Sequence, residues 1–270
     1  NYARGLIEEI LRPGQRIRAK CPWFEQCGGC NLQHLGYDLQ LTAKTAGVRT
    51  TLKRIGGINP DIVGEALPTG PWHYRNKLQA QVGLEEDRLA VGLFAPGSHN
   101  LIPVEDCLIQ RRSTNEYALI IADIARETGI SPWDEKKQSG SLRQVIIRHS
   151  QATGETLAAL VVSPLDFPNR AKFLDGLKKE LPALNSLVLL ENPHPAAAIP
   201  KNREEIVWGP GYITDKIGDL QFIVSARSFW QVNPEGTKVV YDKVKEFAQL
   251  TGKETVLDIY CGTGSIGLYL

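Results

Sequence analysis

Alternating apolar and polar residues predict several short strands in the middle of the chain. The segments KLQAQVG (77–83) and RLAVGLF (88–94) alternate with period two and flank the acidic residues Glu85 to Asp87. This spacing predicts a β-hairpin with an acidic turn. Further strands are expected at 142–149, at 156–163 and in SLVLLE (186–191).

Helical spacings occur before and between these strands. Residues 36–55 carry apolar side chains at helical intervals, have a basic polar side, and end at a Gly-Gly pair. Two more helices are predicted at 114–128 and 168–181. Strands in runs, with helices interspersed, indicate an α+β domain with a largely antiparallel sheet.

The pattern changes near Ser228. Asn233 can cap a helix that starts at Pro234 and runs to Gly252. A strand, TVLDIY (255–260), is expected next, followed by the glycine turn CGTGSIG (261–267) and the start of another helix. Helix, strand, glycine turn and helix in this order predict the opening of a doubly wound α/β domain.

The overall composition is that of an ordinary globular protein, with 42% hydrophobic and 23% charged residues. No apolar run approaches the ~20 residues that cross a bilayer, and no signal-like segment opens the chain. We therefore expect a cytoplasmic protein without membrane association. Residues 1–60 carry nine Lys or Arg against four Asp or Glu. This basic end suits phosphates, and a solvated basic face with no partner explains the charge equally well.

Two features lead us to expect that the sequence is a piece of a longer protein. It contains no methionine, even at residue 1. It also stops at Leu270, within an expected helix. Residues 3–10 have the pattern of a strand, which we expect to be the last strand of a preceding domain.

Three of the five cysteines, Cys21, Cys27 and Cys30, lie within ten residues. Clustered thiols around a Gly-Gly pair are typical of a loop that wraps a metal centre. Cys107 or His34 is the candidate fourth ligand. Four thiolates favour an iron–sulfur cluster, whereas three thiolates and an imidazole favour structural zinc. Buried or disulfide-bonded cysteines are the alternative, but five cysteines in 270 residues do not make a disulfide scaffold.

The glycine turn matches the pattern G-x-G-x-x-G, which alone is weak evidence for a dinucleotide site. Asp258 precedes this turn at the end of the expected strand. An acidic side chain there favours the cationic S-adenosylmethionine over a pyrophosphate, which it would repel. A tight turn without any ligand is the remaining alternative.

Four motifs now point to one family. They are C-P-x-F-x-x-C-G-G-C with L-Q-H (21–34), Y-R-N-K (74–77), S-F-W-Q-V-N (228–233) and D-I-Y-C-G-T-G (258–264). In this order they resemble the RNA uracil-5-methyltransferase family, and more narrowly its iron–sulfur members that methylate 23S ribosomal RNA. The resemblance implies a [4Fe-4S] cluster held by Cys21, Cys27, Cys30 and Cys107, with His34 in a structural or outer role. It also implies that Gln231, Tyr260 and the turn from Gly262 through Gly264 to Ser265 line an S-adenosylmethionine site, which the acidic Asp258 would complete.

The resemblance also implies a division of the chain. Residues 1–12 would end an N-terminal RNA-binding β-barrel, 13–35 would form the iron–sulfur loop, and 36–65 a helix that packs on the methyltransferase domain. Residues 66–227 would form the central α+β domain. Residues 228–270 would begin a Rossmann-like class I methyltransferase domain.

The expected reaction is covalent methylation of uracil C5. A cysteine thiolate adds at C6, and C5 then attacks the donor methyl. A base removes the C5 proton, which expels the cysteine thiolate from C6. By resemblance the nucleophile lies in a later motif, so we expect it and the base beyond residue 270. Cys261, on the glycine turn, is not assigned to this role. No residue of this chain is therefore expected to be catalytic.

RNA is the expected partner, ribosomal RNA in the first place and transfer RNA as the alternative, with no obligate protein partner. The candidate residues for holding its backbone are Arg75, Lys77, Arg143 and Arg148. Trp72 and Tyr74 are candidates for stacking on a splayed base. The alternatives from other classes are a non-catalytic RNA-binding protein with a zinc site, and a redox carrier that uses the cluster for electron transfer.

Overall fold

The computed structural model describes residues 10–12, 14–193 and 203–270. It divides into two compact units, Asn1–Pro68 and Thr69–Leu270, and each is described by itself. The strand predicted at 3–10 and the barrel end predicted at 1–12 lie, apart from residues 10–12, outside the described residues.

The first unit is a loop followed by one long helix. Residues 14–36 contain turns and isolated bridges. Helix α1 (Tyr37–Gly56) confirms the helix predicted at 36–55 and ends where Gly57 takes the left-handed conformation (φ 62°). The short 3-10 helix η1 (Pro60–Ile62) follows. The chain then returns along α1, where the N–H of Ala66 donates to the hydroxyl of Thr45 (2.9 Å).

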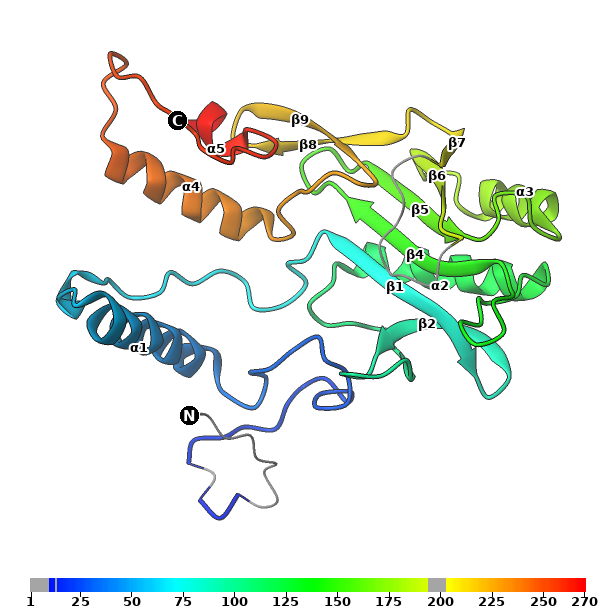
Figure 1. The fold of residues 1–270 in the computed structure, drawn as a ribbon, viewed down its shortest axis with the longest axis horizontal. Coiled ribbons are helices and arrows are strands. Elements are labelled where there is room, and N and C mark those ends of the chain that lie inside the picture. The colour runs from blue at the N-terminus through cyan, green and yellow to red at the C-terminus, as the bar shows by residue number, and fades with distance from the viewer. Residues whose placement is uncertain (1–9, 13, 194–202) are drawn as a thin grey trace. The chain divides into compact units, whose positions relative to one another are not determined.

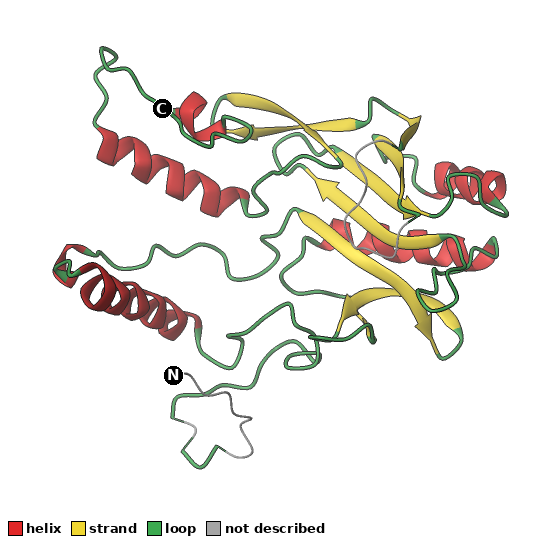
Figure 2. Ribbon diagram, viewed as in Figure 1, coloured by secondary structure: helices red, strands yellow, loops and turns green. Residues whose placement is uncertain are grey.

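A sheet organises the second unit (Figure 2). Within the described residues its seven strands lie in the order β3-β2-β1-β4-β5-β6-β7, and every neighbouring pair except β5–β6 is antiparallel. The prediction of a largely antiparallel α+β domain is thus confirmed. The strands are β1 (Lys77–Glu85), β2 (Arg88–Phe94), β3 (Leu101–Pro103), β4 (Leu142–His149), β5 (Thr156–Val162), β6 (Ser186–Glu191) and β7 (Glu204–Trp208).

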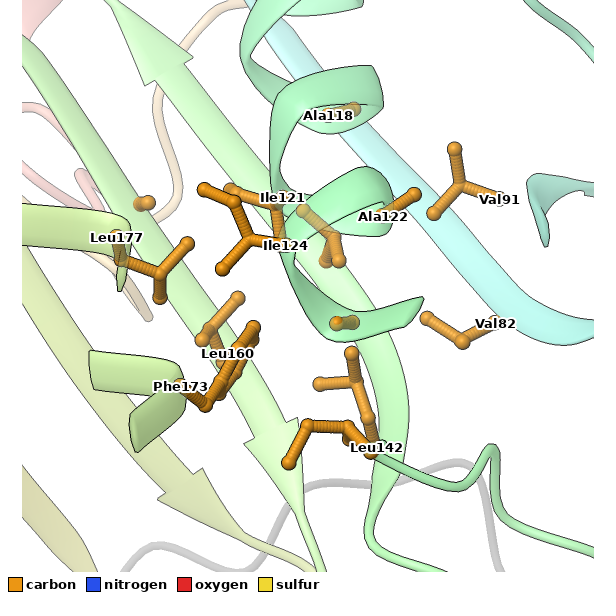
Figure 3. Close-up of a cluster of buried hydrophobic side chains, with 14 of the residues drawn as sticks. Val82, Val91, Ala118, Ile121, Ala122, Ile124, Leu142, Leu160, Phe173 and Leu177 are labelled. Atoms are coloured by element: carbon orange, nitrogen blue, oxygen red, sulfur yellow. The ribbon is translucent and has the colours of Figure 1, made fainter. Parts of the chain in front are cut away.

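Helices α2 (Arg112–Glu127) and α3 (Arg170–Glu180) cover one face of this sheet. Both confirm helices predicted from the sequence, and α3 supplies the crossover that the parallel pair β5–β6 requires. Figure 3 shows Ile121 and Ile124 of α2 among Leu160 of β5 and Phe173 and Leu177 of α3. These buried side chains form the larger of the two cores.

The hairpin of β8 (Tyr212–Ile217) and β9 (Leu220–Ser225) packs on the other face, and helix α4 (Pro234–Ala248) contacts β8 (Figure 1). A second cluster joins Ile146 of β4 to Trp230 and to Tyr241 of α4. Helix α4 begins as predicted, because the Asn233 side chain accepts a hydrogen bond from the N–H of Gly236 (3.0 Å).

The strand predicted at 255–260 is wrong. The structure has no strand there, and the side chains of Leu257 and Tyr260 are 80% and 100% exposed. A strand needs a neighbour for its ladder hydrogen bonds, and none of the described strands lies beside this segment. Helix α4 also ends at Ala248 rather than at Gly252, since Gln249 takes the left-handed conformation (φ 47°). Helix α5 (Ser265–Tyr269) confirms the helix start after the glycine turn.

The sequence analysis did not predict β3, β7 or the β8–β9 hairpin. The hairpin had a readable signal: Ile213 and Ile217 alternate with polar residues before a two-residue turn at Gly218. The signal for β3 is weak, because that strand has three residues. None of the helices in the described part of the chain is both long and apolar enough to cross a membrane.

Replacing Leu160 with Ala should lower the free energy of unfolding by about 2–5 kcal/mol, because the substitution leaves a cavity in the larger core. The Leu160 side chain is 0% exposed. The matched control Leu84→Ala lies at the 57% exposed end of β1 and should change the free energy by about 0.5 kcal/mol or less. Urea denaturation measures both values. Equal losses in the two variants would contradict this position of the core.

Candidate functional site

Two segments that are far apart in the sequence meet at the start of β1. The N–H of Asn76 donates to the carbonyl of Val232 (2.9 Å), and its side-chain Nδ2 donates to the carbonyl of Gln231 (3.3 Å). The carbonyl of Asn76 accepts from the N–H of His149 (2.9 Å). Asn76 is buried, so loss of these bonds would leave polar groups unsatisfied. The motifs Y-R-N-K and S-F-W-Q-V-N thus form one site within the second unit.

Arg148, at the end of β4, holds the beginning of the second motif. Its Nη2 donates to the carbonyls of Ala226 (3.4 Å) and Ser228. Residues 226–233 form neither helix nor strand, so these carbonyls have no ladder partners of their own. The Arg148 guanidinium therefore positions this segment through hydrogen bonds of the kind that secondary structure provides elsewhere.

A buried carboxylate holds the middle of the same segment. The indole Nε1 of Trp230 donates to one oxygen of Asp215 (2.8 Å), and the hydroxyl of Ser150 donates to the other (2.8 Å). A buried charge is stable only when donors surround it. Asp215 therefore fixes Trp230, which stands next to the exposed Gln231.

Three cations gather at this place, and we call Arg75, Lys77 and Arg148 the cation cluster. Lys77 and Arg148 are paired in the register of β1 and β4, so their side chains share one face of the sheet. Burial, followed by the charges of Arg148 and Arg75, lowers the pKa of the Lys77 ammonium to about 8. Burial alone lowers the pKa of Arg148 to about 10, so Arg148 stays charged at neutral pH.

The structure separates Arg143 from the cation cluster. Arg143 lies near the opposite end of β4, where its Nη1 donates to the carbonyl of Asn192 (2.9 Å) and its Nη2 pairs with Glu135. Its guanidinium carbon also lies 4.9 Å from the ring centre of Trp133. The buried guanidinium is thus engaged within the domain. The two aromatic candidates, Trp72 and Tyr74, are half-buried at the start of the Y-R-N-K segment.

The glycine turn has an open backbone. Gly262 and Gly264 take positive φ values of 58° and 72°, and a Cβ at either position would meet no atom within 4 Å. The Asp258 carboxylate accepts from the N–H of Gly267 (3.3 Å), which closes the turn. Tyr260 is fully exposed, and the neighbouring Cys261 thiol is exposed as well. The turn therefore leaves room for a ligand against its main chain.

Helix α4 stands between the two groups of cofactor candidates. Gln231 lies shortly before Pro234, the first residue of α4. The hydroxyl of Ser265, on the turn, forms a hydrogen bond with the hydroxyl of Tyr241 (2.7 Å), about two helical turns further along α4. Tyr269 follows the turn and donates to Asp242 (2.6 Å). The turn and Gln231 are thus attached to one helix at different points along it.

The cysteine loop in the first unit brings three thiols near one another. The N–H of Cys27 donates to the carbonyl of Trp23 (2.9 Å), and the N–H of Cys21 donates to Oε1 of Gln33 (3.1 Å). Burial raises the pKa of the Cys27 thiol, the charges of Cys30 and Cys21 add to this, and a hydrogen bond from the Gly29 backbone opposes it. Mutual repulsion of this kind is what a bound cation relieves.

The thiols are suitable metal ligands, but the structure does not place them in a complete metal site. In the part of the chain that the structure describes, no group of three or more His, Cys, Asp or Glu is arranged to hold a metal ion. All five cysteines are reduced thiols, so the disulfide alternative is not supported. His34 packs against Phe24, with ring centres 5.8 Å apart. Cys107 belongs to the second unit, on the loop that precedes α2.

A cavity of about 690 Å³ lies beside the cysteine loop. Its lining includes the basic residues Arg16, Arg18 and Lys20, the rings of Phe24 and His34, and Cys21. These basic side chains come from one short segment, residues 16–20, all of which line the cavity. Three of the nine basic residues of 1–60 thus lie at this cavity, together with Glu25.

The residues that hold the site together, Asn76, Asp215 and Ser150, were not predicted from the sequence. Asn76 was visible inside Y-R-N-K, but a single asparagine carries no signal of its partner. Asp215 and Ser150 had no signal at all, since only the folded hairpin brings them to Trp230.

Lys77 should react with an amine-selective acylating reagent at pH 8 before the other lysines do. Its pKa of about 8 leaves a large neutral fraction at that pH. Lys238 is the matched control, because its hydrogen bond to Asp242 raises the pKa of its ammonium. Mass spectrometry of tryptic peptides after brief labelling measures both rates. Faster labelling of Lys238 would contradict the electrostatics of the cation cluster.

The chain is similar over its whole length to bacterial proteins named as RNA methyltransferases. It is 43% identical over 271 residues to an uncharacterized RNA methyltransferase of Halalkalibacterium halodurans, and 38% identical over 270 residues to one of Caldanaerobacter subterraneus subsp. tengcongensis. These alignments include 100% of the chain but 59% and 60% of the relatives. The chain therefore spans about three-fifths of the length of these relatives. It matches no protein-family model.

A solved structure has a similar fold. It is Pyrococcus abyssi tRNA (uracil-54, C5)-methyltransferase in complex with S-adenosyl-L-homocysteine, with a TM-score of 0.69 and 26% sequence identity. The similarity covers 92% of the chain and 56% of that enzyme. The chain thus has a mixed α/β fold that is shared with a methyltransferase.

Proposed function

We propose that this chain is part of an enzyme that transfers a methyl group from S-adenosylmethionine to C5 of a uracil in RNA. The observation that carries the proposal is the joining of Y-R-N-K to S-F-W-Q-V-N through Asn76, which puts cations beside Gln231. Similarity to proteins named as RNA methyltransferases, over the entire chain, supports it.

The proposed cofactor residues offer a partial site. The open main chain at Gly262 and Gly264 fits close approach of a nucleoside, and the Asp258 carboxylate fits a cationic donor. Ser265 bonds Tyr241, so its proposed role is to hold the turn on α4. The remaining proposed contacts are Gln231 and Tyr260, both exposed.

The proposed role of this chain in the reaction is to bind and orient the RNA and the cofactor. The cofactor supplies an electrophilic methyl group when bound, and uracil C5 becomes nucleophilic enough to take it only after a thiolate adds at C6. Cys261 lies on the cofactor turn, so we assign the thiolate and the general base to a later segment of the whole protein. The proposed task of the second unit is to hold the RNA strand while its target base leaves the stack.

We also propose a [4Fe-4S] cluster on Cys21, Cys27 and Cys30, with Cys107 as fourth ligand. The support is the soft donor set, with three of the four cysteines in one loop. Metal binding would fix the positions of these ligands. Zinc with His34 in place of Cys107 is the competing assignment.

The supporting observations favour two different kinds of RNA substrate. The motifs with the cysteine loop resemble enzymes of 23S ribosomal RNA, whereas the similar solved structure acts on transfer RNA. We propose ribosomal RNA and keep transfer RNA as the second candidate.

Methyl transfer should yield 5-methyluridine when the whole protein, including the segment proposed to supply the thiolate and the base, is given S-adenosylmethionine and ribosomal RNA, as measured by mass spectrometry of digested nucleosides. Transfer RNA serves as the parallel substrate. Gln231→Ala should lower the rate about tenfold, the effect of one hydrogen bond to a charged ligand. The exposed loop residue Gln138 provides the control substitution Gln138→Ala.

A uridine bearing fluorine at C5 should trap a covalent protein–RNA adduct on a denaturing gel, because the fluorine cannot leave as the C5 proton does. Methylation at a ribose oxygen or at another base, without an adduct, would overturn the proposed reaction.

Protein purified without oxygen should be brown with broad visible absorption, and Cys27→Ser should remove the colour. Cys261→Ser should leave it, since that thiol lies outside the proposed ligand set. Iron and sulfide analysis accompanies the spectra. A colourless protein with one bound zinc would favour the competing site with His34.

A further inference from the structure

We propose that the cation cluster of Arg75, Lys77 and Arg148 is a binding site for one phosphodiester group of an RNA strand. The proposal rests on the proposed function only for the identity of the polymer. It assigns to this place a defined anion site rather than a general basic surface.

The geometry brings the three side chains together on one face. Lys77 and Arg148 are direct partners in the β1–β4 register, and Arg75 precedes Lys77 by two residues, which returns it to the same side of the chain. The next register pair on this face is Gln79 with Ile146, and the Gln79 side chain donates to that of Gln144 (3.0 Å), a diagonal neighbour on β4. Polar side chains and one apolar side chain therefore lie beside the cluster.

The cluster lacks a counter-charge. Among the described residues, none of its three members forms a salt bridge with a carboxylate. Burial, followed by the charges of Arg148 and Arg75, lowers the pKa of the Lys77 ammonium. Three like charges held together inside a fold are unfavourable, and an anion between them reverses the sign of the interaction.

Arg148 supplies a fixed and partly unsatisfied donor. The residue is 4% exposed, and its Nε is buried without a hydrogen-bond partner. Its Nη2 is held by the carbonyls of Ala226 and Ser228, so the guanidinium cannot turn away. A fixed guanidinium supported by two more mobile cations is well suited to the tetrahedral oxygens of a phosphate.

The position of the site favours an RNA strand over a free anion. Arg75 and Lys77 are half-buried, and Asn76 between them bonds the backbone carbonyl of the exposed Gln231. A strand fixed here by its backbone would present a nucleotide to the segment that carries Gln231. The alternative anion is the carboxylate of the methyl donor, and the experiment separates the two.

The test uses a short uridine-containing RNA in which each phosphodiester in turn is replaced by an uncharged methylphosphonate. The wild-type chain should lose affinity about tenfold at one linkage, equal to about 1.4 kcal/mol. Lys77→Gln should bind unmodified RNA about tenfold more weakly than the wild-type chain does, and replacing that linkage should weaken its binding no further. The slope of log affinity against log salt concentration should be smaller by about one in Lys77→Gln. Lys172→Gln, on exposed α3 surface, is the control and should behave as wild type.

Two measurements keep the result interpretable. Circular dichroism and thermal melting establish that Lys77→Gln is folded, and Lys77→Arg should restore most of the affinity. Calorimetry with S-adenosylhomocysteine should give the same affinity in wild type and Lys77→Gln. A cofactor affinity lost in Lys77→Gln, or equal losses at every linkage in both proteins, would overturn the phosphate site. Intact linkage-specific binding, together with no methyl transfer by the whole protein, would overturn the proposed function alone.

Discussion

The register between β1 and β4 is the constraint on which the second unit depends. Side chains of a strand alternate between faces, so this register sends Leu78 and Ile147 into the core under α2 and sends Lys77 and Arg148 to the opposite face. A strand shifted by one residue would send its cation into the apolar core under α2 and its apolar side chain to the opposite face. The core and the cation cluster are thus consequences of one pairing.

Buried polar groups then determine what the opposite face can do. Arg148 and Asp215 carry opposite charges, are both almost fully buried, and each hold a different part of the irregular segment 226–233. Burying a charge is unfavourable unless donors or acceptors surround it. Apolar replacements would pack as well but would not direct a backbone carbonyl or an indole N–H. The segment therefore owes its shape to polar contacts, while the sheet beneath it owes its stability to apolar ones.

Sequence patterns were sufficient for the regular elements of the sheet and its covering helices. The alternation in 77–94 and the Asn233-Pro234 cap were local signals, and the structure confirms both. The strand at 255–260 failed because β-structure depends on a partner, which local sequence does not specify. For the site, the Y-R-N-K segment contained the candidates Arg75 and Lys77, and the family resemblance implied Gln231. It could not show that Arg143 is engaged elsewhere, since that depends on Glu135 and Asn192.

The order of these contacts along the chain has a consequence for biosynthesis. Asn76, Arg148 and Asp215 all precede the segment 226–233 that they hold. Domains fold as units while the ribosome is still adding residues, at about 5–20 residues per second. The segment therefore emerges onto a surface whose anchoring groups have already been synthesised. No residue after 233 is needed for these anchoring contacts.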